Sequence, residues 1–263
     1  GERPEDAIHP DYLSVIAERG AEADVAAALT DALACGVLGA WDELVLPSMD
    51  GDNPLLPWLA NALRGVGRTC EQVVTAAASY IPLPATWEGY LQQLPSSRRA
   101  YVRQSLNRFE RWAGADGRLH EVSDATQLAE GKRVLAALHQ ERWGAGGGKF
   151  GSPRFAAFHD AVMPALLNVG ALELLWLSVR GEPVAAAYNI VWNGKVHFYQ
   201  SGRKMDVPAG QRPGIVLHAH AIRRAIEAGR REYDFLSGGE HYKGQLALAT
   251  RPVVRLRAVR RCL

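Results

Sequence analysis

The sequence of 263 residues lacks most of the features that mark specialised classes of protein. It has only three cysteines, Cys35, Cys70 and Cys262, and their spacing fits neither a disulfide framework nor a metal site. We therefore expect reduced thiols in a cytoplasmic protein. No basic segment followed by an apolar segment opens the chain, so we see no signal peptide.

An excess of one charge and an uninterrupted apolar run are also missing. Thirty Lys and Arg residues face 28 acidic residues, and the net charge of +2 does not by itself point to nucleic acid. Residues 161–179 are almost wholly apolar, but Pro164, Asn168, Gly170 and Glu173 interrupt them. We therefore expect a helix followed by a strand here, and no transmembrane span.

Several catalytic fingerprints are absent from the sequence. It has no Gly-x-Ser-x-Gly elbow, no Walker loop and no dinucleotide fingerprint, which argues against serine hydrolysis and nucleoside triphosphate chemistry. His218 and His220 are two positions apart on a predicted helix and point in different directions, so they are a poor pair of metal ligands. The other histidines show no metal spacing, and we expect no metal cofactor.

The first 80 residues alternate between helical and extended patterns. Residues 23–38 predict a helix, 41–47 a buried strand, 54–63 a second helix and 69–80 a second strand. This order suggests an α/β unit that lacks its beginning. The proline-rich stretch 82–87 is the best candidate for a domain boundary.

Beyond this boundary helical periodicity dominates as far as residue 169. The pattern predicts helices over residues 87–94, 98–113, 125–142 and 153–169, and a strand over 118–122. A serine at 96 or 97 is expected to cap the helix that begins at Arg98. The arginines of that helix are interpreted as a solvated face, although binding of phosphate or of an anionic membrane stays open.

Three consecutive strands follow, over residues 172–179, 184–192 and 195–200. They are rich in leucine, β-branched and aromatic residues. Asn193 and Gly194 separate the last two strands, and Asn-Gly is the strongest short signal of a hairpin because both residues tolerate a positive φ. The sequence therefore predicts an antiparallel meander of three strands.

A glycine-containing turn, residues 209–214, leads into a predicted helix over 213–228 that Gly229 closes. Free N–H groups and the helix dipole at such an N-terminus favour an anion, and Arg212 could contact a phosphate directly. A plain turn between sheet and helix is the alternative. The residues alone leave these two interpretations open.

The next predicted strand, residues 233–236, is followed by Glu240, His241, Tyr242 and Lys243. Ligands of α/β sheets bind where strands end, and a Glu and a Tyr there could act as base and acid. The alternatives are a salt-bridged turn for the cluster and, for Asp234, a role in ordering the loop by hydrogen bonds.

Residues 138–243 resemble the GNAT-type acetyltransferase domain of bacterial CelD-like proteins, which are associated with cellulose biosynthesis. The resemblance rests on Leu138-His-Gln-Glu-Arg142-Trp143, on the meander, on Pro213-Gly214, and on Asp234-Phe-Leu-Ser-Gly-Gly-Glu240-His-Tyr242-Lys243. It implies an α/β (α+β) fold with a mixed, mainly antiparallel sheet flanked by helices. It further implies two GNAT-like lobes: residues 1–84 as the trailing part of an incomplete first lobe and 85–263 as the C-terminal acyltransferase domain.

The resemblance implies an acyltransferase that uses acetyl-CoA or another acyl-CoA. The loop expected to hold the CoA pyrophosphate is Gln211, Arg212, Pro213, Gly214, Ile215 and Val216, although Val216 stands where the motif has a small residue. A substrate amine would attack the thioester directly, with Glu240 as the base and Tyr242 as the acid that protonates the thiolate. The residues expected to bind the acceptor are Arg142, Trp143, Tyr199, Asp234 and Lys243.

The acceptor implied by the resemblance is a small molecule, an amine or a sugar-type glycan precursor, in a cytoplasmic bacterial enzyme of polysaccharide biosynthesis. One alternative is a Fem-type transferase that takes aminoacyl groups from tRNA, which the arginine clusters around residues 98–111 and 251–261 could serve. No heptad-bearing helical arm, usual in Fem-type proteins, is seen. A second alternative is a non-catalytic scaffold in exopolysaccharide assembly. The sequence does not indicate the oligomeric state.

Overall fold

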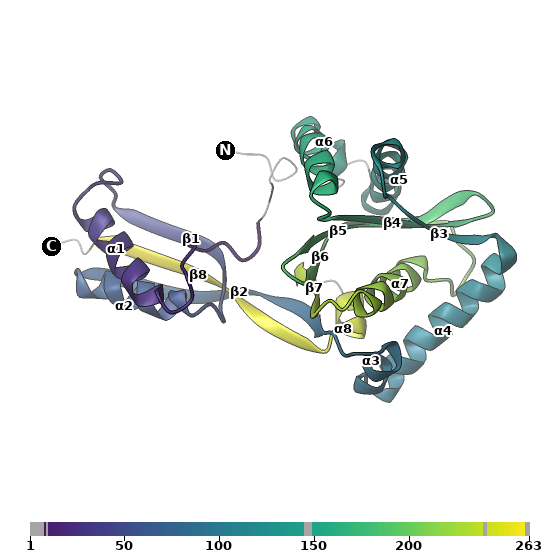
Figure 1. The fold of residues 1–263 in the computed structure, drawn as a ribbon, viewed down its shortest axis with the longest axis horizontal. Helices are drawn as coiled ribbons and strands as arrows, with labels where there is room; N and C mark the ends of the chain where they lie inside the picture. Colours follow the sequence, from purple (N-terminus) through teal and green to yellow (C-terminus); the bar gives the residue numbers. More distant parts are fainter. Residues whose placement is uncertain (1–7, 9, 145–148, 239–240, 261–263) are drawn as a thin grey trace. The chain divides into compact units, whose positions relative to one another are not determined.

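The computed structural model of the chain describes residue 8 and residues 10–144, 149–238 and 241–260 (Figure 1). The described residues form two compact units. The large unit holds residues 8, 79–144, 149–236 and 241–249, and the small unit holds residues 10–78, 237–238 and 250–260. No helix in these described ranges is long and apolar enough to cross a membrane.

The helices and strands lie close to the positions that the hydrophobic patterns predict. The helices are α1 (Glu22–Ala34), α2 (Leu55–Gly65), α3 (Trp87–Gln93), α4 (Ser96–Ala113), α5 (Ala125–Trp143), α6 (Pro153–Asn168), α7 (Pro213–Glu227) and α8 (His241–Leu246), with short 3-10 turns η2 (Gly114–Asp116) and η3 (Lys149–Gly151). The strands are β1 (Glu43–Asp50), β2 (Arg68–Pro82), β3 (Gly117–Glu121), β4 (Leu172–Val179), β5 (Glu182–Trp192), β6 (Lys195–Arg203), β7 (Glu232–Ser237) and β8 (Ala249–Arg260). The predicted mixed α/β class is confirmed.

The small unit has strand order β1-β8-β2, with β1 antiparallel to β8. Leu33 of α1, Leu59 of α2 and Leu256 of β8 belong to its apolar core. At the start of α2, Asn53 Oδ1 accepts the N–H of Leu55 at 2.9 Å, so the side chain of Asn53 supports the helix start.

The large unit has strand order β2-β7-β6-β5-β4-β3. The pairs β3–β4, β4–β5 and β5–β6 are antiparallel, and β6–β7 is parallel. The predicted meander is confirmed, because β4, β5 and β6 follow one another in both sequence and sheet. Asn193 and Gly194 between β5 and β6 have φ values of 47° and 71°, which is the left-handed backbone that an Asn-Gly hairpin requires.

Both faces of the sheet of the large unit are covered by helices, which explains why β4 is mainly apolar on both of its faces. Leu174 and Trp176 pack with residues of α5 and α6, whereas Leu175 and Leu177 belong to the core that includes residues of α4 and α7. Side chains of a strand alternate between its faces, so a strand enclosed on both sides is apolar at most of its positions; Glu173 and Ser178 are the polar residues of β4. Figure 1 shows α5 and α6 on one side of the strands and α7 on the other.

Side-chain caps fix the starts of two helices on the α5 side. Asp124 Oδ1 accepts the N–H groups of Thr126 and Gln127 at 2.8 and 2.9 Å, and Ser152 Oγ accepts that of Phe155 at 3.2 Å. The expected serine cap of α4 is wrong. That helix already begins at Ser96, and no side chain caps it, because both candidate serines lie inside its first turn.

An irregularity in β6 lies close to the start of α7 in the large unit. Tyr188 of β5 pairs with Gln200 and Asn189 with Phe198, so Tyr199 has no opposite residue in β5. One extra residue in a strand is a β-bulge, which reverses the alternation of side chains beyond it. Phe198 therefore faces the α7 side, and so do Ser201 and Arg203.

Candidate functional site

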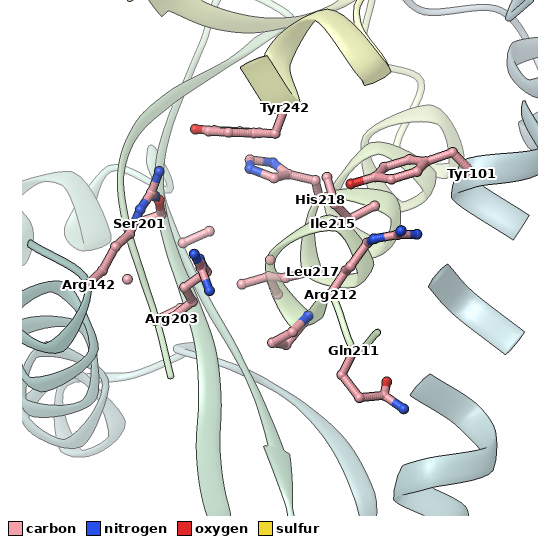
Figure 2. Close-up of a pocket in the computed structure, with 15 residues that line it drawn as sticks. Tyr101, Arg142, Ser201, Arg203, Gln211, Arg212, Ile215, Leu217, His218 and Tyr242 are labelled. Atoms are coloured by element: carbon pink, nitrogen blue, oxygen red, sulfur yellow. The ribbon is translucent and has the colours of Figure 1, made fainter. Parts of the chain in front are cut away.

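A cavity of about 350 Å³ opens in the large unit where the end of β6 meets the start of α7. Its lining comes from α4, α5, β5, β6, α7 and α8. Figure 2 shows Arg142 and Arg203 on one side of the cavity and Arg212 on the other, with His218 and Tyr242 at one end. Segments far apart in the sequence therefore contribute polar groups to one cavity.

The N-terminus of α7 forms one wall of the cavity through Arg212, Pro213, Gly214 and Ile215. The first N–H groups of a helix have no carbonyl partner within it, so those of Gly214 and Ile215 are available to a ligand. Outside the backbone of α7, the one atom of the described residues that a Cβ added to Gly214 would meet within 4 Å is Arg203 Cδ, at 3.8 Å, so the glycine leaves open space. Such a helix start favours an anionic group.

Positive charge dominates the lining of the cavity. Arg142, Arg203 and Arg212 line it, and none of the described residues that line it is Asp or Glu. The Arg212 guanidinium lies 4.2 Å from the centroid of the Tyr101 ring, and Arg142 Nη1 donates to Ser201 Oγ at 2.9 Å. No ion pair between these three arginines and a described carboxylate is present. Their donors suit a bound anion such as phosphate.

His218 lies at the end of the cavity and is 4% exposed. Its ring stacks on that of Tyr242 with 5.3 Å between centroids and 24° between planes. Burial, and then the charges of Arg142 and Lys243, lower the pKa of His218 to about 3. The imidazole is therefore neutral at physiological pH and is a poor acceptor of a proton from a substrate.

Several residues that the sequence predicted for the site do line this cavity. They are Arg142, Gln211, Arg212, Pro213, Gly214, Ile215 and Tyr242. Val216 belongs instead to the buried core beneath α7, with no exposed surface. Glu240 lies outside the described residues. The roles assigned to all of these residues stay predictions.

Asp234, expected to bind the acceptor, is fully buried in β7 and does not line the cavity. Its Oδ1 accepts the N–H of Leu236 at 2.7 Å. Leu236 has a φ of 58°, which is unusual for a residue other than glycine. The carboxylate therefore supports the turn at the end of β7, which is the alternative that the sequence left open for this residue.

The other three predicted acceptor-binding residues lie outside the cavity wall. Tyr199 packs its ring against those of His159 and Tyr188 on the α5 side of the sheet. Lys243 is 4% exposed within α8, and Trp143 is 43% exposed. The Arg142 guanidinium lies 4.6 Å from the Trp143 ring centroid, so Trp143 can orient Arg142 from behind.

Four polar residues of the cavity, Tyr101, Ser201, Arg203 and His218, were not predicted from the sequence. A signal for His218 was present, since it lies four positions after Gly214 and therefore on the same side of α7. Ser201 and Arg203 enter the cavity because of the bulge in β6. The sequence alone contains no comparable signal for Tyr101, whose place depends on the packing of α4 against α7.

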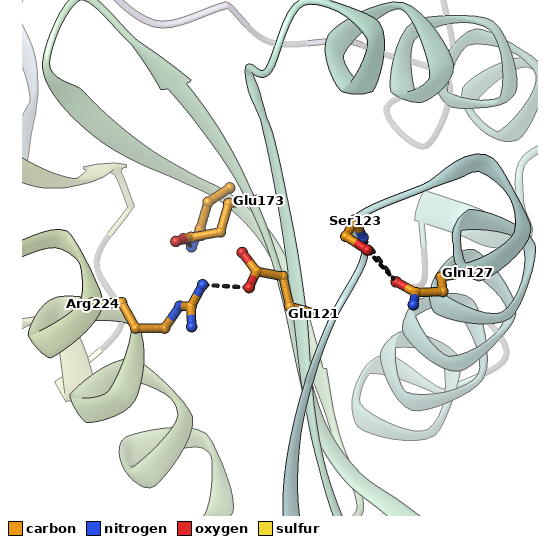
Figure 3. Close-up of polar contacts among 6 residues, drawn as sticks. Glu121, Ser123, Gln127, Glu173 and Arg224 are labelled. Atoms are coloured by element: carbon orange, nitrogen blue, oxygen red, sulfur yellow. Dashed lines mark hydrogen bonds and ion pairs between the residues drawn. The ribbon is translucent and has the colours of Figure 1, made fainter. Parts of the chain in front are cut away.

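A second polar cluster lies beneath the sheet at the other end of α7. Figure 3 shows Glu173 of β4 next to the ion pair between Arg224 of α7 and Glu121 of β3. Asn189 Nδ2 donates to Glu173 Oε2. Burial raises the pKa of Glu173 above its ordinary value, and the hydrogen bond from Asn189 opposes this rise.

We expect Glu173→Gln to stabilise the protein increasingly as the pH rises. Because the pKa of Glu173 is raised in the folded state, its contribution to the free energy of unfolding is fully present below the pKa of the unfolded state. That contribution is lost as the pH rises through the pKa of the folded state. Glutamine keeps an oxygen for Asn189 and carries no charge at any pH. Urea unfolding of both proteins between pH 4 and pH 8 measures the effect, and a difference in unfolding free energy that stays constant with pH would contradict it.

A family model for the acetyltransferase (GNAT) domain matches residues 96–244, which is more than half of the chain and includes most of the large unit. The chain belongs to the GNAT acetyltransferase family. It is accordingly an acyltransferase enzyme. No curated protein matches the chain in sequence.

Solved structures share the fold of this GNAT acetyltransferase at low sequence identity. FemX matches with a TM-score of 0.64 and 11% identity, over 93% of this chain and 78% of its own. The C-terminal domain of a protein from Agrobacterium fabrum described as a lysylphosphatidylglycerol synthetase matches with a TM-score of 0.55 and 15% identity, over 89% of this chain and 72% of its own. L-PGS from Bacillus licheniformis matches with a TM-score of 0.52 and 13% identity, over 83% of this chain and 68% of its own.

Membership of the GNAT family implies an acyl-CoA as co-substrate, and the residues that line the cavity of this GNAT acetyltransferase suit the phosphates of such a molecule. Three arginines and the start of α7 suit its phosphates, and the missing side chain of Gly214 leaves room beside them. Gln211 Oε1 is buried without a hydrogen-bond partner among the described residues, so it is ready to accept from a ligand. The described residues contain no cluster of three His, Cys, Asp or Glu that could hold a metal ion.

Proposed function

We propose that this enzyme transfers an acyl group from acetyl-CoA, or from another acyl-CoA, to an amine or a sugar-type acceptor by direct attack. One observation carries the proposal: a cavity lined by three arginines and by no described carboxylate lies at the N-terminus of α7. A volume of about 350 Å³ is within the range of small-molecule sites. Such a site recognises a polyanionic co-substrate.

Gln211, Arg212, Gly214 and Ile215 hold the phosphates in this proposal. The N–H groups of Gly214 and Ile215 donate to phosphate oxygens, and Arg212 adds a charged donor. Stacking on Tyr101 restricts the motion of the Arg212 guanidinium, so less freedom is lost when it binds an anion. Arg203 lines the opposite side of the cavity and can neutralise further charge.

The proton transfers are assigned to Glu240 and Tyr242. The acyl-CoA supplies an acyl group that is activated as a thioester. Glu240, directly or through a water, takes the proton of the attacking amine, and Tyr242 protonates the departing sulfur. Strand N–H groups next to the bulge at Tyr199, where the β-ladder is interrupted, polarise the carbonyl. Arg142 binds the acceptor in this proposal, with the ring of Trp143 next to its guanidinium.

Two experiments test the proposal. The first is calorimetric titration of the whole chain with acetyl-CoA, and the second is an assay for free thiol with a panel of amines and amino sugars. We expect saturable binding and release of thiol that depends on the acceptor. The scaffold alternative predicts either no binding or binding without turnover. Thiol release that is absent with every acceptor would favour that alternative over catalysis.

Replacing Arg212 by Gln is expected to raise the KM for acetyl-CoA by about 10- to 150-fold while kcat changes little. The variant loses a charge-assisted hydrogen bond to a phosphate, which is worth about 1.5 to 3 kcal/mol, in the ground state and the transition state alike. Steady-state kinetics with varied acetyl-CoA measures the change. Arg223→Gln is the matched control, because Arg223 is also on α7 but does not line this cavity. Equal KM values for both variants would contradict the assignment.

A Fem-type transfer of an aminoacyl group from tRNA is the second candidate. It is supported by the similarity of fold to FemX over 93% of the chain and by the fold shared with the two lysylphosphatidylglycerol synthetase-type proteins. Filter binding of tRNA over a salt series, compared with binding of acetyl-CoA, separates the two candidates. Tight tRNA binding with a steep salt dependence and no acetyl-CoA binding would favour the aminoacyl transfer.

The subfamily, the biosynthetic role, the location and the domain bounds of the enzyme are also proposals. We propose a CelD-like bacterial acetyltransferase acting on a precursor of polysaccharide biosynthesis in the cytoplasm, on the strength of the sequence motifs around Arg142 and Tyr242. Residues 1–84, as the trailing part of a first GNAT-like lobe, and 85–263, as the catalytic domain, stay predictions. Thiol release with amino sugars but not with simple amines would support this placement.

A further inference from the structure

One ring nitrogen of His218 is bonded within the protein, and the other is not. Nδ1 lies 3.2 Å from the hydroxyl oxygen of Tyr233, which is fully buried. The described residues provide no hydrogen-bond partner for Nε2. His218 is almost wholly buried and lines the cavity, so a ligand bound in the cavity is the candidate partner for Nε2.

The position of the proton on His218 follows from its neighbours. Tyr233 also has a side-chain hydrogen bond with Asn189 that opposes the rise in its pKa, as a bond donated by the amide to the phenol oxygen does. The buried hydroxyl then donates its own proton to His218 Nδ1, 3.2 Å away. Burial, and then the charge of Glu173, raise the pKa of Tyr233 well above its usual value, so the hydroxyl stays protonated. A neutral imidazole that accepts at Nδ1 carries its own proton on Nε2.

Arg142 supplies a second donor at this end of the cavity. It is half-buried, its Nη1 donates to Ser201 Oγ, and its guanidinium lies 5.5 Å from the ring centroid of Tyr242. A guanidinium has five N–H donors and no acceptor. Only one donor bond to a described side chain is recorded for Arg142, so others are available in the cavity.

We propose that His218 Nε2–H and the Arg142 guanidinium form a subsite, here called the donor corner, that binds a substrate oxygen carrying full or partial negative charge. The proposal rests on the proposed acyl transfer and names one substrate group for it. A fixed neutral N–H and a guanidinium match a carbonyl or carboxylate oxygen, and they repel an ammonium group. The oxygen belongs either to the carbonyl of the transferred acyl group or to a carboxylate on the acceptor.

A neutral imidazole is well suited to this task. Its proton stays on Nε2 because the hydrogen bond from Tyr233 fixes the tautomer and burial prevents the formation of imidazolium. A preoriented donor needs no rearrangement when charge develops on the oxygen, which is the basis of electrostatic stabilisation in transfer reactions. In this arrangement Tyr233 is a positioning residue and His218 contacts the substrate.

Nuclear magnetic resonance of protein labelled with ¹⁵N-histidine tests the tautomer without substrate or turnover. We expect the His218 ring to be neutral with the proton on Nε2 at every pH from 5 to 8, and Tyr233→Phe to alter its Nδ1 shift. The His218→Gln variant identifies the resonance by its loss. A proton on Nδ1, or protonation of the ring within this range, would overturn the proposal whether or not the protein transfers acyl groups.

Kinetics with acetyl-CoA and a matched pair of acceptors, an amino acid and the amine that lacks its carboxyl group, identifies the source of the oxygen. If it is the acyl carbonyl, His218→Leu and Arg142→Gln lower kcat by about 10- to 10³-fold with both acceptors. If it is a carboxylate of the acceptor, both variants raise KM for the amino acid and leave the kinetics with the amine unchanged. His218→Gln retains an N–H near the position of Nε2 and should lose less activity than His218→Leu.

His220→Leu is the control, since His220 lies on the same helix but does not line the cavity. Circular dichroism and thermal unfolding show whether each variant folds. Folded His218→Leu and Arg142→Gln proteins with the kinetics of the parent for both acceptors would overturn the donor corner. Absence of acyl transfer in the parent would instead count against the proposed function, and the resonance experiment would still decide the tautomer.

Discussion

Replacing Glu240 by Gln is expected to slow acyl transfer by about 10²- to 10⁴-fold, and replacing Tyr242 by Phe should have an effect of similar size. Both residues are assigned to proton transfer, and each change removes the ionisable group while keeping the size of the side chain. The ring that stacks on His218 is retained in Tyr242→Phe, so the cavity keeps its shape. Steady-state kcat with saturating acetyl-CoA and acceptor measures both effects.

Two matched controls exist in the same unit. Glu227→Gln changes a carboxylate in the last turn of α7 that does not line the cavity, and Tyr188→Phe removes a buried hydroxyl that has no hydrogen-bond partner among the described residues. Both controls should keep the turnover of the parent. Unchanged turnover in Glu240→Gln or in Tyr242→Phe would remove that residue from the mechanism.

The Gly202→Ala variant is expected to lose about 3 kcal/mol of unfolding free energy, which is an upper value for overpacking. A Cβ on Gly202 would lie 2.2 Å from the backbone nitrogen of His139 and 2.3 Å from the carbonyl carbon of Leu138. Backbone atoms cannot move aside as a side chain can, so β6 and α5 must separate. For a chain of this size, the midpoint of thermal unfolding should fall by roughly 6–12 °C.

The same substitution should also impair the site, because Arg142 on α5 and Ser201 and Arg203 on β6 line the cavity. Gly65→Ala is the control. Gly65 ends α2, and outside the backbone of that helix a Cβ there meets no atom of the described residues within 4 Å. That change should leave stability equal or raise it by up to about 1 kcal/mol, since alanine favours helix. Equal stability of Gly202→Ala and the parent would show that β6 and α5 can separate at little cost.

The architecture of the large unit was largely predictable because its signals are local. The apolar run 172–179 and the Asn193-Gly194 turn each specify a strand or a hairpin within a few residues. The start of α7 was equally visible in Pro213 and Gly214. Local dihedral preference and hydrophobic pattern determine these elements before any long-range contact forms.

The chemistry of the cavity was less predictable because it depends on contacts between distant segments. Tyr101 and Arg212 are far apart in sequence, and only the packing of α4 beside α7 brings them together. Asp234 has the composition expected of a site residue, yet its carboxylate bonds to the backbone of its own turn. Residue type indicates what a side chain can do, whereas the fold determines which group it meets.

The bulge at Tyr199 has a consequence for how this site can change over evolution. If β6 alternated regularly from Phe198, Gln200 and Gly202 would face α7, and Ser201 and Arg203 would lie against α5. One extra residue reverses that order and brings the hydroxyl and the guanidinium into the cavity. The polar groups that β6 presents to the cavity therefore depend on the number of residues in this strand. A single insertion or deletion would turn Ser201 and Arg203 away from the cavity without changing the type of any residue.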